Sequence, residues 1–84
     1  MTAHRILWVV DYDIPEYPKA KRRAFYRART QLFKDHKICV HRSTDSVLIC
    51  DHKTLAMALY NLAVRYGEAH LYRVLEVAGG KTFY

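Results

Sequence analysis

The stretch Ile6-Leu7-Trp8-Val9-Val10-Asp11-Tyr12 decides the fold, because nearly every residue in it is apolar or aromatic. Alternate residues of a strand face opposite sides of a sheet, so such a run predicts a central strand covered on both faces. We expect helices on one face and a ligand or a second subunit on the other, an open face that would account for Trp8, Val10 and Tyr12. The strand should end near Asp13-Ile14-Pro15, because proline cannot donate a ladder hydrogen bond.

Two amphipathic helices are predicted after this strand. The first runs from Pro18 to His36, since proline suits a first helical turn and Phe25, Ala28 and Leu32 recur at helical spacing. The second follows Asp51, a good N-cap residue, and ends at Gly67, a residue that accepts the left-handed conformation after a helix. Its apolar stripe consists of Leu55, Leu59, Leu62, Ala63 and Tyr66.

A hairpin and a final strand complete the predicted elements. Residues 38–42 and 47–50 are short β-branched segments around the polar turn residues 43–46, and residues 68–77 alternate in strand fashion. If Thr44 and Asp45 are the central turn residues, Ile38, Val40, Val47 and Ile49 share the core face. Cys39 then lies opposite Cys50 on the other face, and both thiols are expected to be reduced.

The element order strand, helix, strand, strand, helix, strand is that of the α+β, ferredoxin-like β-α-β-β-α-β fold. This fold has an antiparallel four-stranded sheet with two helices on one face. We expect one domain over residues 1–77, followed by a tail, residues 78–84, that either frays or adds a strand to a sheet edge. A chain of 84 residues buries only about 60% of its unfolded surface, which favours a homodimer.

The chain is strongly basic, with 14 Lys and Arg residues against 8 Asp and Glu and a formal net charge of +6. Such a charge attracts polyanions, and nucleic acid, either RNA or duplex DNA, is the expected partner. No apolar run approaches the roughly 18 residues that span a bilayer, so no membrane partner is expected. We expect the protein in the cytoplasm.

The basic residues gather on the first predicted helix. Phosphate-backbone binding is predicted for Lys19, Arg22, Arg23, Arg27 and Lys34, with Arg42 continuing the surface nearby. Aromatic residues lie between them in the sequence, which strengthens the case for nucleic acid. The alternative is a solvated charged face without a ligand. Contacts to phosphates would position the protein without reading base sequence.

Two carboxylates lie at the end of the first strand. Asp11 and Asp13 are alternate residues, so their side chains can converge on one face. Mg²⁺ or Mn²⁺ can be held by one or two carboxylates together with waters and substrate phosphates. The alternative is that one aspartate caps the loop and the other is solvated.

Three segments together resemble the small CRISPR-associated protein Two (Cas-two) family. They are Tyr12-Asp13-Ile14 at the strand end, Arg22-Arg23 on the following helix, and Val40-His41-Arg42-Ser43 on the second strand. The strand-terminal Tyr-Asp-Ile is the most specific of them. The resemblance runs in order over residues 6–43, and Asp11 has no counterpart in the motif.

The resemblance implies a ferredoxin-like homodimer of CRISPR adaptation, in which the strand-end aspartates face each other across the two-fold axis. Asp13 would then be the catalytic residue and metal ligand of an endonuclease acting on RNA or DNA, with Asp11 as an accessory catalytic carboxylate. Arg22 and Arg23 take the basic-helix role and Ser43 the second-strand role. The family also acts without catalysis, holding duplex DNA beside a protein partner in a CRISPR integration complex.

A second hypothesis is a non-catalytic scaffold or regulatory module of the same fold that binds nucleic acid or a protein partner. The polar Thr44-Asp45-Ser46 follows Ser43 where the family usually continues with apolar residues. A distant relative, such as a toxin-like ribonuclease with changed activity, therefore stays among the alternatives.

Overall fold

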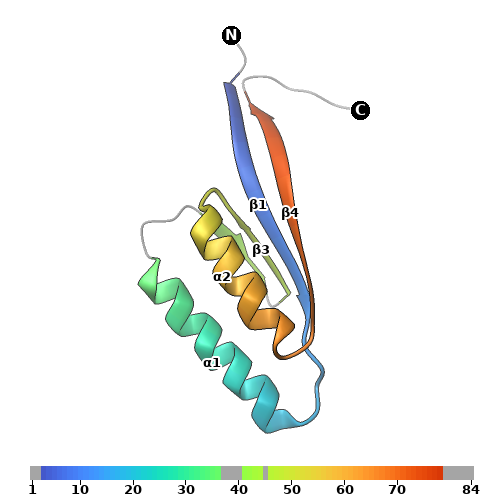
Figure 1. Ribbon diagram of the computed structural model, residues 1–84. Helices are drawn as coiled ribbons and strands as arrows, with labels where there is room; N and C mark the ends of the chain where they lie inside the picture. Colours follow the sequence, from blue (N-terminus) through green and yellow to red (C-terminus); the bar gives the residue numbers. More distant parts are fainter. Residues whose placement is uncertain (1–2, 37–40, 45, 79–84) are drawn as a thin grey trace.

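The computed structural model describes residues 3–36, 41–44 and 46–78. Its elements follow in the order strand, helix, strand, strand, helix, strand (Figure 1). They are β1 (Ala3–Asp13), α1 (Lys19–Asp35), β2 (His41–Ser43), β3 (Val47–Cys50), α2 (Lys53–Val64) and β4 (Glu68–Ala78). The prediction of a mixed α+β protein with two helices is confirmed.

β1 is the central strand of an antiparallel sheet. It pairs with β4 along its whole length, from Ala3 opposite Ala78 to Asp13 opposite Glu68, and with β3 over four residues. β2 pairs with β3 over three residues, so the order across the sheet is β2-β3-β1-β4. The long apolar run of β1 therefore lies between two neighbouring strands, as such a run predicts.

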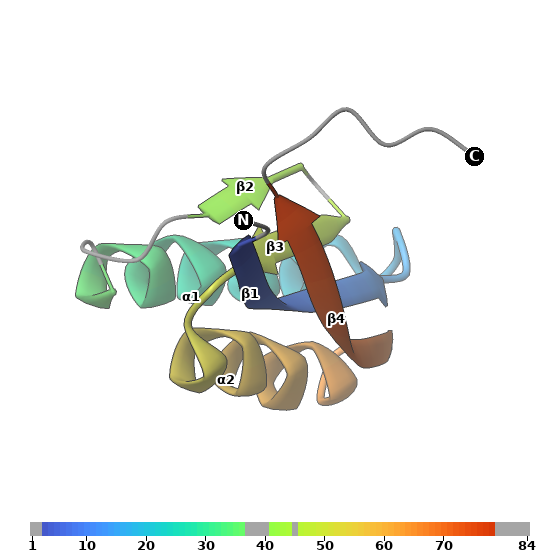
Figure 2. The same cartoon turned by 90° about the horizontal axis from the view of Figure 1, so that it is seen from above.

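Both helices pack against one face of the sheet (Figure 2). Val10 and Tyr12 of β1 form a single buried cluster with Phe25 of α1 and with Leu55 and Leu59 of α2. The rings of Tyr12 and Phe25 lie 5.3 Å apart at a tilted angle. The assignment of Trp8, Val10 and Tyr12 to the open face was wrong, because this set of alternate positions packs toward the helices. The sequence held a signal for this choice, since the other set of alternate positions ends in the charged Asp11 and Asp13.

The predicted hairpin register was also wrong. His41 lies opposite Cys50 and Ser43 opposite Leu48, which moves the register by two residues. Leu48 and Cys50 are buried, whereas Val47 and Ile49 are only partly buried and face the other way. All four residues of β3 are apolar, so its sequence does not indicate which alternate residues face the core. Ile38, Cys39 and Val40 lie outside the described residues, and Cys50 is a free, buried thiol opposite His41.

The ends of α2 differ from the prediction in their chemistry. His52, rather than Asp51, is the N-cap, and its Nδ1 accepts a hydrogen bond from the Leu55 amide at 3.3 Å. At the other end, the φ of Gly67 is not left-handed. A Cβ at this position would lie 2.3 Å from the Asp13 carbonyl oxygen, so glycine is required for a close approach of two backbones.

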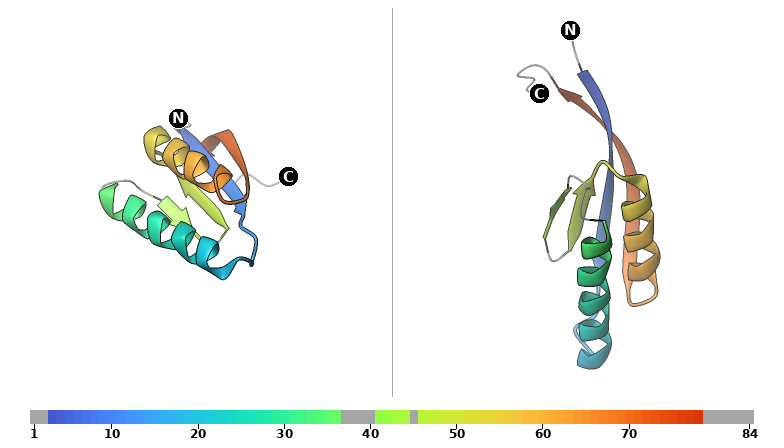
Figure 3. Two further views of the ribbon diagram at one scale, coloured as in Figure 1. Left: turned by 60° about the horizontal axis from the view of Figure 1, so that its bottom comes forward. Right: turned by 90° about the vertical axis from the view of Figure 1, so that its left-hand side faces the viewer.

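β1 and β4 extend beyond the helices as a two-stranded ribbon (Figure 3). β3 reaches only as far as Trp8, so Arg5, Ile6 and Leu7 pair with β4 alone. Arg5 and Glu76 form a cross-strand ion pair of 2.7 Å in this ribbon. The molecule is accordingly elongated, with extents of 50 × 28 × 16 Å. Within the described part of the chain, no helix is long and apolar enough to cross a membrane.

Candidate nucleic-acid interface and strand-end carboxylates

The positive charge of the protein is concentrated on α1. This helix carries seven of the 14 Lys and Arg residues and only one of the 8 acidic residues, Asp35. Seven basic and seven acidic residues are left for the rest of the chain, so the formal charge of +6 is that of α1 alone. A polyanion approaching the molecule is therefore attracted to one element.

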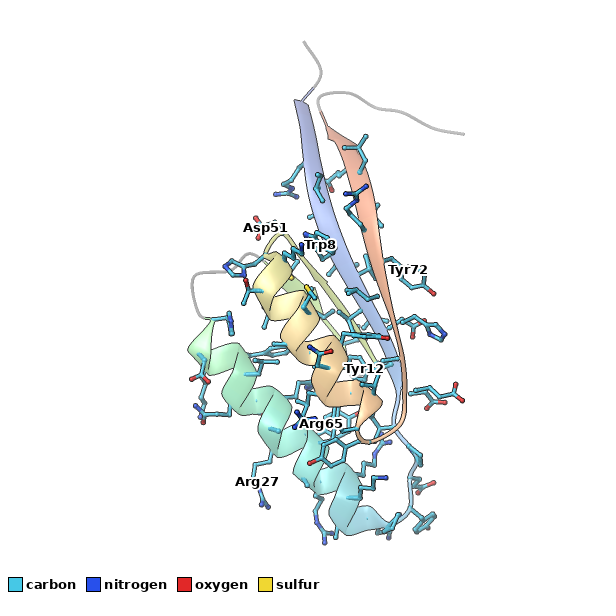
Figure 4. The ribbon with its side chains drawn as sticks, viewed as in Figure 1. Trp8, Tyr12, Arg27, Asp51, Arg65 and Tyr72 are labelled. Carbon is cyan, nitrogen blue, oxygen red and sulfur yellow. The ribbon has the colours of Figure 1, made fainter. Side chains whose placement is uncertain are left out.

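Four of the predicted nucleic-acid-binding residues form a continuous line on α1. Lys19, Arg23, Arg27 and Lys34 are all exposed, and their spacing of four, four and seven residues keeps them on one side of the helix. The exposed hydroxyl-bearing residue Thr30 lies on the same side. We call these five residues the α1 stripe. Figure 4 shows Arg27 pointing away from α2 and the sheet.

Arg22, the fifth predicted residue of the helix, has a different environment. Its Nη1 donates a hydrogen bond to the Ile14 carbonyl, and its guanidinium lies 5.1 Å from the Tyr26 ring centroid. Its side chain is partly buried. Arg22 thus ties the loop after β1 to the first turns of α1, and its donors are directed into the protein rather than along the stripe.

Arg29 is a second inward-facing arginine, and the sequence analysis did not single it out. Its Nη1 donates to the Tyr12 hydroxyl at 2.8 Å and to the Thr44 carbonyl at 2.9 Å. The guanidinium also lies 4.8 Å from the Tyr26 ring centroid. Arg29 therefore links α1, β1 and the β2–β3 turn. Helical periodicity places Arg29 on a different side of α1 from the stripe, and this spacing was the sequence signal that could have identified its inward role.

Asp11 and Asp13 are exposed at the end of β1, on the sheet face that the helices leave uncovered. The β1–β4 register places His70 opposite Asp11 and Glu68 opposite Asp13. Directly opposed residues of an antiparallel pair lie on the same face, so four titratable side chains share this end of the sheet. We call Asp11, Asp13, Glu68 and His70 the acidic end.

The acidic end stands on a well-packed base. Tyr12 and Ile14 alternate with the two aspartates and are buried in the core. If β1 turned its carboxylates inward, the side chains of Tyr12 and Ile14 would become exposed to solvent. The Asp13 carbonyl is packed against Gly67, the residue that precedes β4. The Tyr and Ile of the Tyr12-Asp13-Ile14 segment thus hold the backbone, and the Asp between them projects outward.

The acidic end supplies donors to a cation but does not by itself enclose one. Among the described residues, no three His, Cys, Asp or Glu side chains are grouped closely enough to hold a metal ion. A Mg²⁺ or Mn²⁺ ion bound there would take one or two carboxylates from the protein and its other ligands from water and substrate phosphates. The donor set fits that mode of binding.

Glu68 and His70 were missed by the sequence analysis, because only the pairing of β1 with β4 places them beside the aspartates. Arg42 and Ser43 belong to β2, where Arg42 lies opposite Ile49 and Ser43 opposite Leu48. Their side chains lie outside the described part of the chain. Among the described residues, the α1 stripe and the acidic end are thus the groups of predicted site residues that the structure brings together.

Comparison of the chain with protein-family models, with curated proteins and with solved structures finds no match. The functional argument therefore depends on the geometry of these two features.

Proposed function

We propose that this protein binds the phosphate backbone of nucleic acid along the α1 stripe. The observation that carries the proposal is that the whole formal charge of the protein resides on α1, with four exposed cations on one side of that helix. A solvated helix face would normally mix both signs of charge, and this one contains no acidic residue within the stripe.

The dimensions of the stripe suit a phosphate backbone. At a rise of about 1.5 Å per residue, Lys19 and Lys34 are separated by roughly 22 Å along the helix axis. That length corresponds to about six phosphates of one strand of a duplex, whose repeat is about 3.4 Å. The rings of Tyr26 and Phe33 are partly buried beside Arg29. Tyr17, by contrast, is 65% exposed and its ring centroid lies 5.6 Å from Nζ of Lys19, so one ring at the end of the stripe is open to base stacking, a contact that tolerates any base. Binding without base-sequence preference follows from this composition.

The test compares two exposed arginines that carry the same charge. Arg27 belongs to the stripe, whereas Arg65 is the C-cap residue of α2. We expect Arg27→Gln to lower the affinity for a labelled 20-base-pair duplex roughly five- to tenfold at about 0.1 M salt, because one phosphate contact is lost. Arg65→Gln should change it far less. Equal losses in the two variants would mean that net charge, and not the stripe, determines binding.

The finer proposal is a Cas-two-like protein of CRISPR adaptation with a four-stranded ferredoxin-like fold, acting in the cytoplasm. The order β2-β3-β1-β4 and the resemblance over residues 6–43 support it. In this proposal Arg23 and Lys19 hold the nucleic acid, with Arg42 and Ser43 on the second strand extending the contact. Arg22 contributes by holding the β1–α1 loop, since its Nη1 donates a hydrogen bond to the Ile14 carbonyl there.

A second candidate activity is metal-dependent hydrolysis of phosphodiester bonds at the acidic end. It is favoured by the placement of Glu68 and His70 beside Asp11 and Asp13 on one exposed face. A divalent ion would polarise a phosphate and lower the pKa of an attacking water. Asp13 would be the ligand of that ion. Asp11 would be the accessory carboxylate, and His70 lies opposite it in the β1–β4 register.

Hydrolysis is tested with labelled RNA and duplex DNA in Mg²⁺ or Mn²⁺, using Asp13→Asn and Asp11→Asn. The control is Glu16→Gln, which removes an exposed carboxylate from the loop before α1. We expect metal-dependent cleavage that Asp13→Asn abolishes and Glu16→Gln leaves unchanged. Cleavage that persists at the wild-type rate in Asp13→Asn would remove Asp13 from the mechanism.

The alternative to hydrolysis is a scaffold that binds nucleic acid or a protein partner without turnover. It predicts the same dependence on Arg27 and no cleavage under any metal condition. Tight binding that is insensitive to salt would instead favour a protein partner, because contacts to phosphates release counterions and weaken as salt rises.

A further inference from the structure

β4 is the outermost strand at one side of the sheet, and along its 11 residues its outer edge pairs with no other described strand. Natural proteins usually shorten or cover an edge of this length, because its unpaired N–H and C=O groups recruit another strand. The edge is also apolar. Tyr72, Val74 and Leu75 are 48%, 40% and 59% exposed, respectively. Figure 4 shows Tyr72 projecting from β4 on the side away from the helices.

We propose that two copies of this chain join edge to edge through antiparallel pairing of β4 with β4, about a two-fold axis at Arg73. This register opposes Tyr72 of one copy to Val74 of the second, and the symmetry of the pair repeats that contact. It also places His70 of one copy opposite Glu76 of the other, so that an imidazole N–H can donate a hydrogen bond to a carboxylate. On the face toward the helices, it sets Leu71 opposite Leu75, where Leu75 is now exposed.

The neighbouring registers are poorer. An axis at Tyr72 would set Glu68 against Glu76, which are like charges on the same face. An axis at Val74 would set Tyr72 against Glu76 and Arg73 against Leu75, so two exposed apolar side chains, those of Tyr72 and Leu75, would each meet a charged one. The register centred on Arg73 has one unfavourable contact, that between Arg73 of one copy and Arg73 of the other. The two arginine side chains are long enough to point away from each other. The charge pattern of β4 therefore selects a second copy in one register.

Edge pairing differs from the face-to-face dimer that the Cas-two resemblance implies. Glu68 lies opposite Asp13 in each copy. In the register centred on Arg73, Glu68 of the second copy lies opposite Ala78 of the first, which is ten residues away from Glu68 of the first copy. At about 3.3 Å per residue, the two acidic ends would be roughly 30 Å apart along the joined strands. The Asp13 carboxylates of the two copies would then not meet, so the two dimers are distinguishable with single cysteines.

The first experiment is oxidative cross-linking of the full chain carrying Arg73→Cys, Asp13→Cys or Thr54→Cys, the last an exposed control on α2. All three variants keep the two natural cysteines, so wild type supplies the background. We expect disulfide-linked dimer from Arg73→Cys at several times the background and none above background from Thr54→Cys. Preferential cross-linking through Asp13→Cys would overturn edge pairing.

The second experiment measures the oligomeric state by light scattering after gel filtration. Leu75→Glu places a carboxylate opposite Leu71 of the second copy and should weaken the dimer at least tenfold. Its matched control is Met57→Glu, which alters an exposed apolar residue of α2 that is 41% exposed. Circular dichroism checks that both variants fold. A monomeric wild type, or a dimer that Leu75→Glu and Met57→Glu affect equally, would overturn the proposal.

Discussion

At the scale of single residues, Gly67 shows how a close backbone approach supports the candidate site. A Cβ at this position would lie 2.3 Å from the Asp13 carbonyl oxygen and 3.0 Å from Cδ of Pro15. The first is a backbone atom of the last residue of β1 and the second belongs to a proline ring, so neither is the free end of a flexible side chain. The start of β4 and the end of β1 can approach each other only where no side chain intervenes.

We therefore expect Gly67→Ala to destabilise the protein by about 1 to 3 kcal/mol, as overpacking of a close contact does. Urea unfolding followed by circular dichroism measures this change, with Asn61→Ala as the control at an exposed site of α2. Because the strain falls on Asp13, metal-dependent cleavage should fall more in Gly67→Ala than binding to the α1 stripe does. An unchanged free energy of unfolding would contradict the close contact.

At the scale of elements, α1 separates two roles by its faces. Lys19, Arg23, Arg27 and Lys34 lie on the exposed stripe, whereas Arg29 reaches Tyr12 and the Thr44 carbonyl. Phe25, on the same inward side, is fully buried against the aromatic core. Residues of one type and one charge thus serve either packing or solvent contact, according to their position in the helical repeat.

This separation predicts that substitution of Arg29 lowers stability, whereas substitution of Arg27, only two residues away, lowers nucleic-acid affinity. Arg29→Gln should lower the free energy of unfolding by about 1.5 to 3 kcal/mol, since hydrogen bonds from a charged donor are lost. Arg27→Gln should leave stability nearly unchanged and lower nucleic-acid affinity. Thermal unfolding and duplex binding, measured on both variants below the unfolding transition, test the pair. Equal destabilisation by the two substitutions would argue against the inward role of Arg29.

At the scale of the whole molecule, positive charge lies along one helix and negative charge lies at one end of the sheet. A stripe that engages phosphates with Z cations gives a log–log salt slope of about −0.9Z on duplex DNA. If all four cations of the stripe make contact, the slope should be about −3.6, and each neutral substitution should reduce its magnitude by about 0.9. Titrations of wild type and Arg23→Gln at several salt concentrations measure it. A slope near zero would exclude phosphate contacts as the source of affinity.

The sequence analysis placed the elements well, because it used features that are local to the chain. The first helix was expected from Pro18 to His36, and α1 spans Lys19–Asp35 with Pro18 as its N-cap. The final strand was expected over residues 68–77, and β4 spans Glu68–Ala78. Proline geometry, helical spacing and strand alternation act within a few residues, so they are visible without the partner element. The same spacing placed Arg23 and Arg27 on one exposed face, but Arg22 was grouped with them and its inward contact with the Ile14 carbonyl was not foreseen.

The tertiary structure alone decided which side of β3 faces the core and which strands lie beside one another. β3 is apolar at both sets of alternate positions, so its sequence does not show which set is buried, and the structure buries Leu48 and Cys50. In β1 the carboxylates of Asp11 and Asp13 already favour burial of the other set, which packs with Phe25, Leu55 and Leu59. That choice places Tyr12 inside and Asp13 outside, and it brings Glu68 and His70 to the aspartates through the β4 register. Sequence by itself determined where the charges lie along the chain. Long-range pairing decided which of them share a surface, because the energy that fixes a register belongs to two strands together.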